Sequence, residues 1–304
     1  MILERTRHTD TYRAIRDLSS SHKDYAISEL CRHGHVTRVA YYKWLHRKSS
    51  PNDGLNHKLA ALAEKIHKEH PDMGYRRFRD KIEHDHGLHA NDKRVLRICR
   101  KRKLRSVIKG RHNCCTKPAV DPYYTAENLL NRDFHADNYN QKWVTDVTEF
   151  KYTAEDGTVK KVYLSAILDL CDRRLVSYVI GDSNNNQLVF QTLDKALEAN
   201  PGAQPLFHSD RGFQYTNKNF RTKIEQAGMR QSMSRVAHCL DNGPMEGFWG
   251  ILKREMYYRR KFRSRQELVQ AIEDYINYYT YERPQRRLGI LTPSELHEHL
   301  SLMA

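Results

Sequence analysis

The sequence predicts two kinds of structure in succession, an all-α N-terminal part and an α/β part with a mixed five-stranded sheet and flanking helices. Two observations carry this prediction. Apolar residues recur at helical spacing up to about residue 105, and β-rich segments alternate with helical ones from residue 141 onwards. The length of 304 residues fits two or three domains of ordinary size.

The composition is strongly basic. Lys plus Arg number 52 and Asp plus Glu 37, which gives a net charge of +15. Such an excess favours a polyanionic partner, nucleic acid first and an acidic membrane second. No stretch approaches the roughly 18 apolar residues of a membrane span, and the charged N-terminus is unlike a signal peptide. The six scattered cysteines indicate reduced thiols of a cytosolic protein, and the His/Cys cluster at residues 112–115 is interpreted as a loop.

The first helical region is expected at residues 1–50. Within it, residues 22–48 predict two short helices around a turn, with Thr37 placed to cap the second. A helix-turn-helix fits this pattern, and a plain αα-hairpin fits it equally well. If the first alternative holds, Arg38 and Lys43 on the second helix are candidate DNA contacts.

A second helical DNA-binding domain is expected at residues 51–108, with three helices. Asn91 is placed to cap the third of them, whose outer face is cationic. A cationic helix at the end of a three-helix unit is typical of a DNA-reading helix, although a solvated face would have the same pattern. The candidate DNA contacts of this domain are Arg76, Arg77, Lys93, Arg94 and Arg97.

The catalytic-looking domain is expected at residues 139–262, after a linker at 109–138 that includes a short helix near 127–131. Its elements follow the order β-β-β-α-β-α-β-α, which is also the order of a ribonuclease-H-like fold. An amphipathic helical extension at 263–304 ends the chain. The expected strands are 142–151, 161–170, 174–180, 206–209 and 229–234, and the expected helices are 186–198, 219–227 and one from about 244.

Three carboxylates stand out in this domain. Asp146 lies in the middle of an apolar strand, Asp210 ends a short buried strand, and Glu246 lies near the start of a helix. Taken singly, each has a plain alternative: a buried ion pair, a turn residue, or a partner of the helix dipole. Taken together, they are the oxygen ligands that two Mg²⁺ ions need to act on a phosphodiester. Lys253 lies two helical turns beyond Glu246, on the same face.

The residues around these acids form three motifs. They are KWVTDVT at 142–148, HSDRGFQY at 208–215 and DNGPMEGFWGILK at 241–253, with 35 residues between Asp210 and Glu246. Each resembles one catalytic motif of the DDE transposases and retroviral-type integrases, and the spacing is similar to their D-D-35-E pattern.

The resemblance is greatest to the second-frame transposases of bacterial insertion sequences that move by a copy-out, paste-in route. It includes VTRVAYYKW at 36–44 and GYRRF at 74–78, and so covers nearly the whole chain. It implies that water attacks a phosphodiester at an element end and frees a 3′-hydroxyl. That hydroxyl then attacks a second phosphodiester, and the element leaves as a circle before it is integrated.

The resemblance also implies the roles of residues and partners. Asp146, Asp210 and Glu246 would hold two Mg²⁺ ions, with Mn²⁺ as a substitute, and Lys253 would touch DNA near the reactive phosphate. The expected partners are double-stranded DNA of the terminal repeats and of the target, further copies of this chain in a dimer or higher oligomer on DNA, and possibly the upstream-frame product. The expected location is the bacterial cytoplasm, at the nucleoid, without a membrane partner.

Two alternatives remain open. One is a DNA-binding regulator that keeps a silent catalytic fold, against which the intact set of three acids argues. The other is a ribonuclease-H-type nuclease that acts on RNA in hybrids.

Overall fold

The computed structural model describes residues 8–22, 24–48, 50–108, 124–235 and 239–303. The chain divides into two compact units, residues 1–61 and residues 62–304. The His/Cys cluster at 112–115 lies outside the described residues. Among the helices within these ranges, none is both long enough and apolar enough to cross a bilayer.

The first unit contains a small three-helix core. Ile15, Cys31 and Tyr41 are buried against one another. The Thr37 hydroxyl accepts a hydrogen bond from the Ala40 amide at 3.2 Å, which confirms the predicted cap. The first helix was not predicted from the sequence, although its Ile15 is buried in this core and its Tyr12 packs against it. The helices are α1 (His8–Ser21), α2 (Ile27–His33) and α3 (Arg38–Leu45).

Three further helices precede the sheet. They are α4 (Pro51–Glu69), α5 (Tyr75–His86) and α6 (Asp92–Lys101). The Asn91 side chain accepts a hydrogen bond from the Arg94 amide at 2.7 Å and so caps α6 as predicted. Helix α6 buries Val95 and Ile98 and exposes Lys93, Arg97, Arg100 and Lys101, which confirms the predicted amphipathic pattern.

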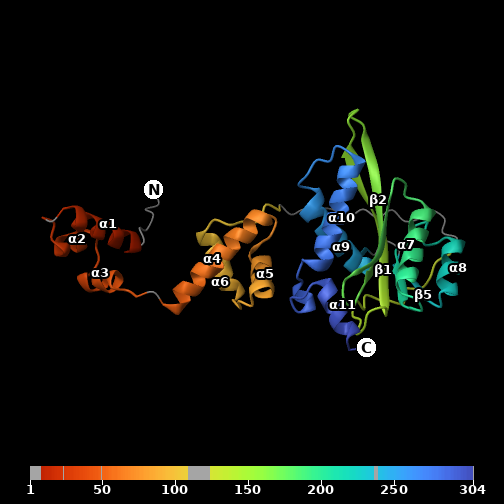
Figure 1. Cartoon of the computed structure of the whole chain (residues 1–304), viewed down its shortest axis with the longest axis horizontal. Helices are drawn as coiled ribbons and strands as arrows, with labels where there is room; N and C mark the ends of the chain where they lie inside the picture. Colours follow the sequence, from red (N-terminus) through yellow and green to blue (C-terminus); the bar gives the residue numbers. More distant parts are fainter. Residues whose placement is uncertain (1–7, 23, 49, 109–123, 236–238, 304) are drawn as a thin grey trace. The chain divides into compact units, whose positions relative to one another are not determined.

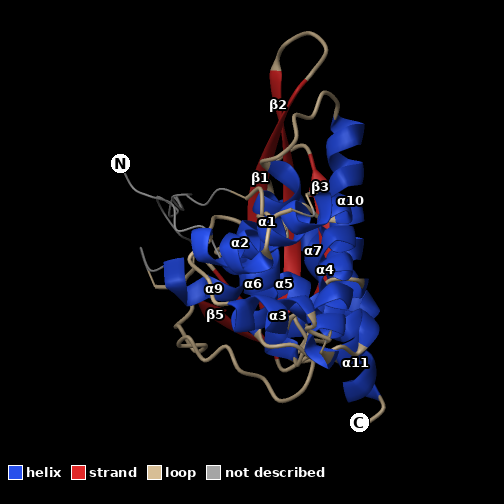
Figure 2. Cartoon of the chain, turned by 90° about the vertical axis from the view of Figure 1, so that its left-hand side faces the viewer, coloured by secondary structure: helices blue, strands red, loops and turns tan. Residues whose placement is uncertain are grey.

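The second unit is built on a five-stranded mixed sheet in the order β3-β2-β1-β4-β5. Strands β1, β2 and β3 are antiparallel neighbours, whereas β4 runs parallel to β1 and β5 parallel to β4. The hairpin of β1 and β2 extends beyond the rest of the sheet (Figure 2). The strands are β1 (Lys142–Thr153), β2 (Val159–Asp169), β3 (Leu175–Gly181), β4 (Leu206–Ser209) and β5 (Arg230–Met233).

Helices cover both faces of this sheet, and each face has its own apolar core (Figure 1). The alternation of side chains along β1 supplies both cores, because Trp143 packs in one while Val144 and Phe150 pack in the other. Helices α7 (Asn186–Ala199) and α8 (Lys218–Gln226) cover the first face. Helices α9 (Gly243–Leu252) and α10 (Arg265–Tyr281) cover the second, and α11 (Pro293–Ser301) follows them.

The short helix predicted near residues 127–131 is wrong, because that segment contains no helix. Its polar groups bond to the sheet domain instead. The Leu130 amide donates to the Ser232 hydroxyl at 3.0 Å, and the Asn128 amide group donates to the Asp241 carboxylate at 3.0 Å. These tertiary hydrogen bonds replace the local ones that a helix would need.

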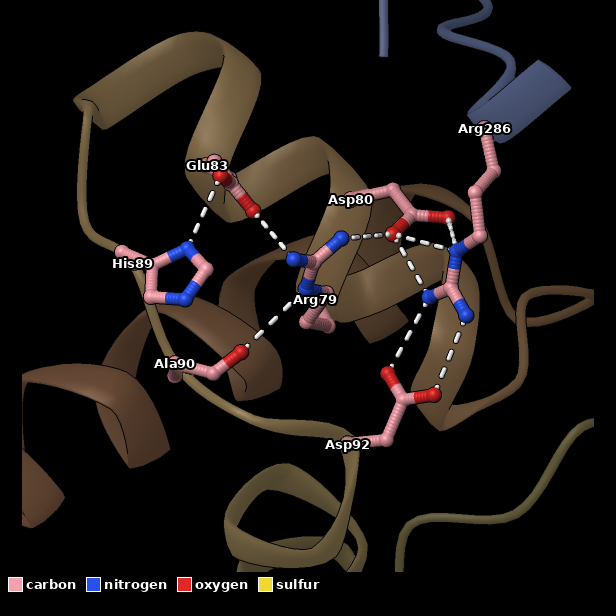
Figure 3. A network of polar contacts seen from close by, with 7 residues as sticks. All are labelled: Arg79, Asp80, Glu83, His89, Ala90, Asp92 and Arg286. Atoms are coloured by element: carbon pink, nitrogen blue, oxygen red, sulfur yellow. Dashed lines mark hydrogen bonds and ion pairs between the residues drawn. The ribbon is translucent and has the colours of Figure 1, made fainter. Parts of the chain in front are cut away.

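Arg286 joins the α5–α6 pair to the C-terminal part of the same unit (Figure 3). It lies in a 3₁₀ turn, Arg286–Leu288, between α10 and α11. Its guanidinium is 2.7 Å from the carboxylate of Asp80 and 3.0 Å from that of Asp92. Arg79 also binds Asp80, at 2.9 Å. Asp80 is 6% exposed, so these arginines neutralise a buried charge.

A second buried ion pair lies where α9 continues into a π-helical turn, Lys253–Tyr257. The Glu255 carboxylate in this turn is 2.9 Å from Arg77 of α5 and 2.9 Å from Arg283 beyond α10, and it accepts a hydrogen bond from the Tyr275 hydroxyl at 2.9 Å. The Glu255 side chain is 8% exposed. This carboxylate therefore fixes the end of the α9 segment to two other helices.

We predict that Glu255→Gln lowers the free energy of unfolding of the second unit by about 3 kcal/mol or more, because it leaves two arginines without their shared counter-charge. Urea denaturation measures the change. Glu149→Gln is the matched control, since the Glu149–Lys161 pair lies at the surface and should contribute less than about 1 kcal/mol. Equal losses in the two variants would contradict this assignment.

Candidate active site

Asp146 lies on β1 in a setting that holds both oxygens of its carboxylate. Oδ1 accepts a hydrogen bond from the Val147 amide at 2.8 Å, and Oδ2 accepts one from Trp249 Nε1 at 3.0 Å. Trp249 belongs to α9 and packs in the same core as Val144. The Asp146 side chain therefore lies on the same face of the sheet as that of Val144, as the alternation along a strand predicts. A strand residue is thereby joined to the helix that carries Glu246.

Asp210 follows β4 directly. Strands β1 and β4 are parallel, and Val144 pairs with His208 in their register. Asp146 and Asp210 each come two residues later, so the register brings them to the same end of the two strands. The Asp210 carboxylate accepts a hydrogen bond from the Gly212 amide at 2.8 Å. A Cβ atom at Gly212 would lie 3.0 Å from that carboxylate oxygen, so a larger residue here would crowd the Asp210 side chain.

Glu246 lies in the first turn of α9, and its position is set by the residue just before that helix. The Asn242 side chain donates a hydrogen bond to the backbone carbonyl of Thr145 at 2.9 Å. This bond fixes the start of α9 beside β1, one residue from Asp146. Met245 and Phe248 are buried in the core below, which leaves Glu246 on the partly exposed side of the helix.

The charges of these acids act on one another. Burial, followed by the negative charge of Asp210 and that of Glu246, raises the pKa of Asp146 to about 8, although the hydrogen bonds from Val147 and Trp249 oppose the shift. Burial also raises the pKa of Asp210. The site therefore brings the three predicted acids within electrostatic range of one another.

The chemistry of this donor set suits a hard divalent cation, because carboxylate oxygens are the ligands that Mg²⁺ prefers. The pKa of Asp146 indicates negative charge that the surrounding protein does not neutralise. Within the described ranges, however, no three His, Cys, Asp or Glu side chains already stand in a metal-binding arrangement.

Lys253 begins the π-helical turn at the end of α9. Its ammonium nitrogen lies 5.3 Å from the ring centroid of Phe150, on β1. The Lys253 cation thus lies beside β1, at Phe150, which comes four residues after Asp146 on the same strand.

The other acids near the strand ends, Asp169 and Asp172, make structural contacts. Asp169 accepts a hydrogen bond from Trp143 Nε1 at 3.1 Å, and Asp172 accepts one from the Arg174 amide at 2.8 Å. Asp172 also lies 2.8 Å from His297. Burial and the charge of Asp172 raise the pKa of Asp169 to about 6. Neither is among the acids whose charges act on Asp146.

Asp241 has a role that sequence reasoning did not resolve. Its side chain is fully buried and lies 2.7 Å from Arg132 and 2.8 Å from Arg235. The hydrogen bonds from Arg235 come first among the causes that hold its pKa well below the usual range. Asp241 therefore anchors the chain just before α9. The third motif contains Asp241, but the spacing within that motif carries no information about these two arginine partners.

The predicted DNA contacts lie on helices outside the sheet. Arg38 and Lys43 are exposed on α3 of the first unit. In the second unit the basic residues of α5 and α6 are exposed at positions 76, 93 and 97, and Arg94 is half-buried. Arg77 differs from these, because its guanidinium binds Glu255 and Asp72. Contact between Arg77 and DNA would require it to leave these partners.

Family models match three parts of the chain. The description "Integrase core domain" covers residues 136–239 in one model and 246–300 in another, and "HTH-like domain" covers residues 55–112. The integrase core matches contain the mixed sheet and the three acids, which agrees with the predicted ribonuclease-H-like fold. The helix-turn-helix-like match falls on the α4–α6 region.

Whole-chain relatives agree with these matches. The chain is 36% identical over 272 residues to the putative transposase InsK for insertion sequence element IS150 of Escherichia coli K12, which covers 89% of this chain and 93% of that protein. It is 32% identical to the 31 kDa protein of insertion element IS600 of Shigella sonnei, over 90% of this chain and 100% of that protein. An uncharacterised transposase-like protein of Haemophilus influenzae is 41% identical over 56% of this chain and 76% of its own length.

We predict that Asp146 contributes a loss of stability to the metal-free protein as the pH rises from 4 to 8. Folding raises the pKa of Asp146 from 3.8 to about 8, so the folded state binds more protons than the unfolded state in this window. Asp146→Asn should remove the loss and be more stable than wild type at pH 8 by at least about 1.4 kcal/mol, the equivalent of one pKa unit. Urea denaturation in EDTA measures the difference.

Glu198→Gln, at an exposed position on α7, serves as the control and should follow the wild-type pH profile. An Asp146→Asn profile parallel to that of wild type would show that repulsion among the three acids is absent.

Proposed function

The chain belongs to the family of insertion-sequence transposases with an integrase core domain, and from this premise we propose that it cuts and joins DNA at the ends of its element. The observation that carries the proposal is geometric: the β1–β4 register brings Asp146 and Asp210 to the same strand ends, and the bond from Asn242 to Thr145 starts the helix of Glu246 beside them. The pKa of Asp146, raised by burial and by the charges of Asp210 and Glu246, agrees with this placement. A protein keeps such a repulsive cluster at a functional site more readily than at a structural one.

The proposed reaction has two steps of one kind. Water attacks a phosphodiester at the element end and frees a 3′-hydroxyl, which then attacks a second phosphodiester. The first transfer leads to an excised circle, and the circle is later integrated. Neither step forms a covalent bond to the protein, so no Ser or Tyr nucleophile is needed.

Asp146, Asp210 and Glu246 would hold two Mg²⁺ ions, or Mn²⁺ as a substitute. When bound, such ions stabilise the charge on the attacking and leaving oxygens of a phosphodiester. The chain's own groups prepare this set: Trp249 orients the Asp146 carboxylate and the Gly212 amide orients that of Asp210. We propose that binding of the ions includes a turn of these three side chains toward a common point.

Lys253 would place a positive charge near the reactive phosphate, and the exposed basic residues of α3, α5 and α6 would bind DNA further out. The partners would be the terminal repeats and target DNA, together with further copies of this chain and an upstream-frame product. The reaction would take place at the nucleoid, in the bacterial cytoplasm.

Two other functions differ in measurable ways. A regulator with a silent catalytic fold would bind terminal-repeat DNA and leave it uncut. A ribonuclease-H-type nuclease would cut the RNA strand of a hybrid. Comparing a terminal-repeat duplex with an RNA–DNA hybrid of the same sequence separates the three functions, and we expect cleavage of the duplex alone.

We predict that Asp146→Asn lowers the rate of cleavage at an element end by at least about 10³-fold, about 4 kcal/mol of transition-state stabilisation, while DNA binding is retained. The reason is the loss of a carboxylate ligand at the reacting phosphate. Mapping of nicks in Mg²⁺ measures the first effect and fluorescence anisotropy the second. Asp169→Asn is a control for loss of an acid on a neighbouring strand, and its cleavage rate per folded molecule should match that of wild type.

Full cleavage by Asp146→Asn in Mg²⁺ would remove this assignment. Loss of DNA binding in the same variant would show instead that the substitution disturbs the fold.

We also predict that at least two copies of the chain bridge a pair of DNA ends, because cutting and joining two ends requires an active site near each. Mass photometry of the complex with terminal-repeat DNA measures the number of chains. One chain per pair of synapsed ends would refute this expectation.

A further inference from the structure

A groove of ≈ 850 Å³ lies between the β1–β2 hairpin and the segment that follows the π-helical turn. Residues 151–155 and Val159 of the hairpin line one side, and Tyr257 with residues 260–263 lines the other. None of the residues proposed above as metal ligands or DNA contacts lines it.

Two contacts fasten the second side of this groove to β1. The Tyr257 hydroxyl donates a hydrogen bond to the Lys151 carbonyl and accepts one from the Lys151 amide, both at 2.9 Å. Five residues later, the Phe262 carbonyl accepts a hydrogen bond from the Thr153 amide at 3.0 Å, and the Phe262 side chain is buried. Residues 258–261 are thus held at both ends, and their own side chains are exposed.

The exposed side chains of this segment are mostly cationic. Arg260, Lys261 and Arg263 line the groove together with Lys151, whereas Glu155 is the acid among the lining residues. In the described part of the chain, Lys151 pairs with Glu149 at 3.6 Å, and no salt bridge forms at positions 260, 261 or 263. Clustered cations with so little acidic compensation favour a polyanion with evenly spaced charges.

The groove is connected to the candidate active site through aromatic rings. The ring of Phe150 lies 5.1 Å from that of Tyr257 in an edge-on arrangement, and Lys253 lies over the same Phe150 ring. Along β1, Lys151 comes five residues after Asp146. At the rise per residue of an extended strand, Asp146 and Lys151 are about 17 Å apart along β1. On DNA, this distance corresponds to about five base pairs, because phosphates of one strand follow one another every 3.4 Å along the helix axis.

We propose that this groove binds the phosphate backbone of duplex DNA, about five base pairs from the phosphodiester that reacts at Asp146. Arg260, Lys261 and Arg263 bind the phosphates. The inference rests on the proposed function, because it takes Asp146 as the place of reaction. It adds a DNA-binding surface within the integrase core to those on the N-terminal helices.

The test uses the full chain and a terminal-repeat duplex with its flanking DNA. The groove variant combines Arg260→Gln, Lys261→Gln and Arg263→Gln. If each residue neutralises one phosphate, the slope of log affinity against log salt should fall in magnitude by about 0.9 for each of the three substitutions, or about 2.7 in all. Fluorescence anisotropy over a range of salt concentrations measures the slope.

Two controls isolate the charge and the place. Arg260→Lys, Lys261→Arg and Arg263→Lys together keep the charges, and the wild-type slope should be retained. Lys195→Gln, Lys218→Gln and Arg230→Gln remove three exposed basic residues from the α7, α8 and β5 region, and should lower the slope by less than a third as much as the groove variant.

A change in the DNA tests the location. Neutral methylphosphonate linkages about five base pairs from the scissile phosphate should weaken wild-type binding and leave the groove variant unaffected, because that variant lacks the three cations that we propose bind those phosphates. Equal weakening of both proteins, or an unchanged slope in the groove variant, would overturn the proposal. If instead wild type neither binds nor cuts the duplex, the proposed function itself fails, so the two failures are distinguishable.

Discussion

The close placement of Asp146, Asp210 and Glu246 is the constraint on which the candidate site depends. Burial is the main cause that raises the pKa of Asp146 to about 8, and the charges of Asp210 and Glu246 add to it. Three contacts hold the acids in place: the parallel pairing of β1 with β4, the hydrogen bond from Asn242 to the backbone of β1, and the packing of α9 on the sheet. Such a cluster is relieved most simply by a bound divalent cation.

Ion pairs connect the helix that carries Glu246 to other parts of the second unit. Helix α9 carries Glu246 at its start and continues at its end into the π-helical turn with Lys253 and Glu255. Glu255 is bound to Arg77 of the helix-turn-helix-like region and to Arg283 beyond α10. A π turn is an uncommon element that is frequent at functional sites. Here it joins the helix of the site to a helix of the region expected to bind DNA.

Much of the fold could be predicted from the sequence. The alternation along 142–150 indicated the face of Asp146, and the caps at Thr37 and Asn91 marked two helix starts correctly. Periodicity failed at 127–131, where tertiary hydrogen bonds replace local ones, and α1 was not predicted. Local spacing carries no information about such long-range partners.

The acids of the candidate site could be proposed from the sequence, whereas their hydrogen-bond partners could not. The three motifs indicated the acids, and the β1–β4 register explains why two of them meet. The hydrogen bond from Trp249 to Asp146, the ion pairs of Asp241, and the internal use of Arg77 depend on residues distant in the chain. The sequence shows that the segment 259–263 is basic, but it does not show that these residues line a groove. The groove depends on the hydrogen bonds of Tyr257 and Phe262 to β1, which join residues about 110 positions apart in the chain.

The most direct test of the central claim is to count metal ions on the protein bound to a pre-cleaved element end. Electron paramagnetic resonance of Mn²⁺ gives the number bound per active site. We expect about two ions for wild type, and weaker binding with fewer ions when Glu246→Gln removes one ligand. The same stoichiometry and affinity in the two proteins would contradict the account.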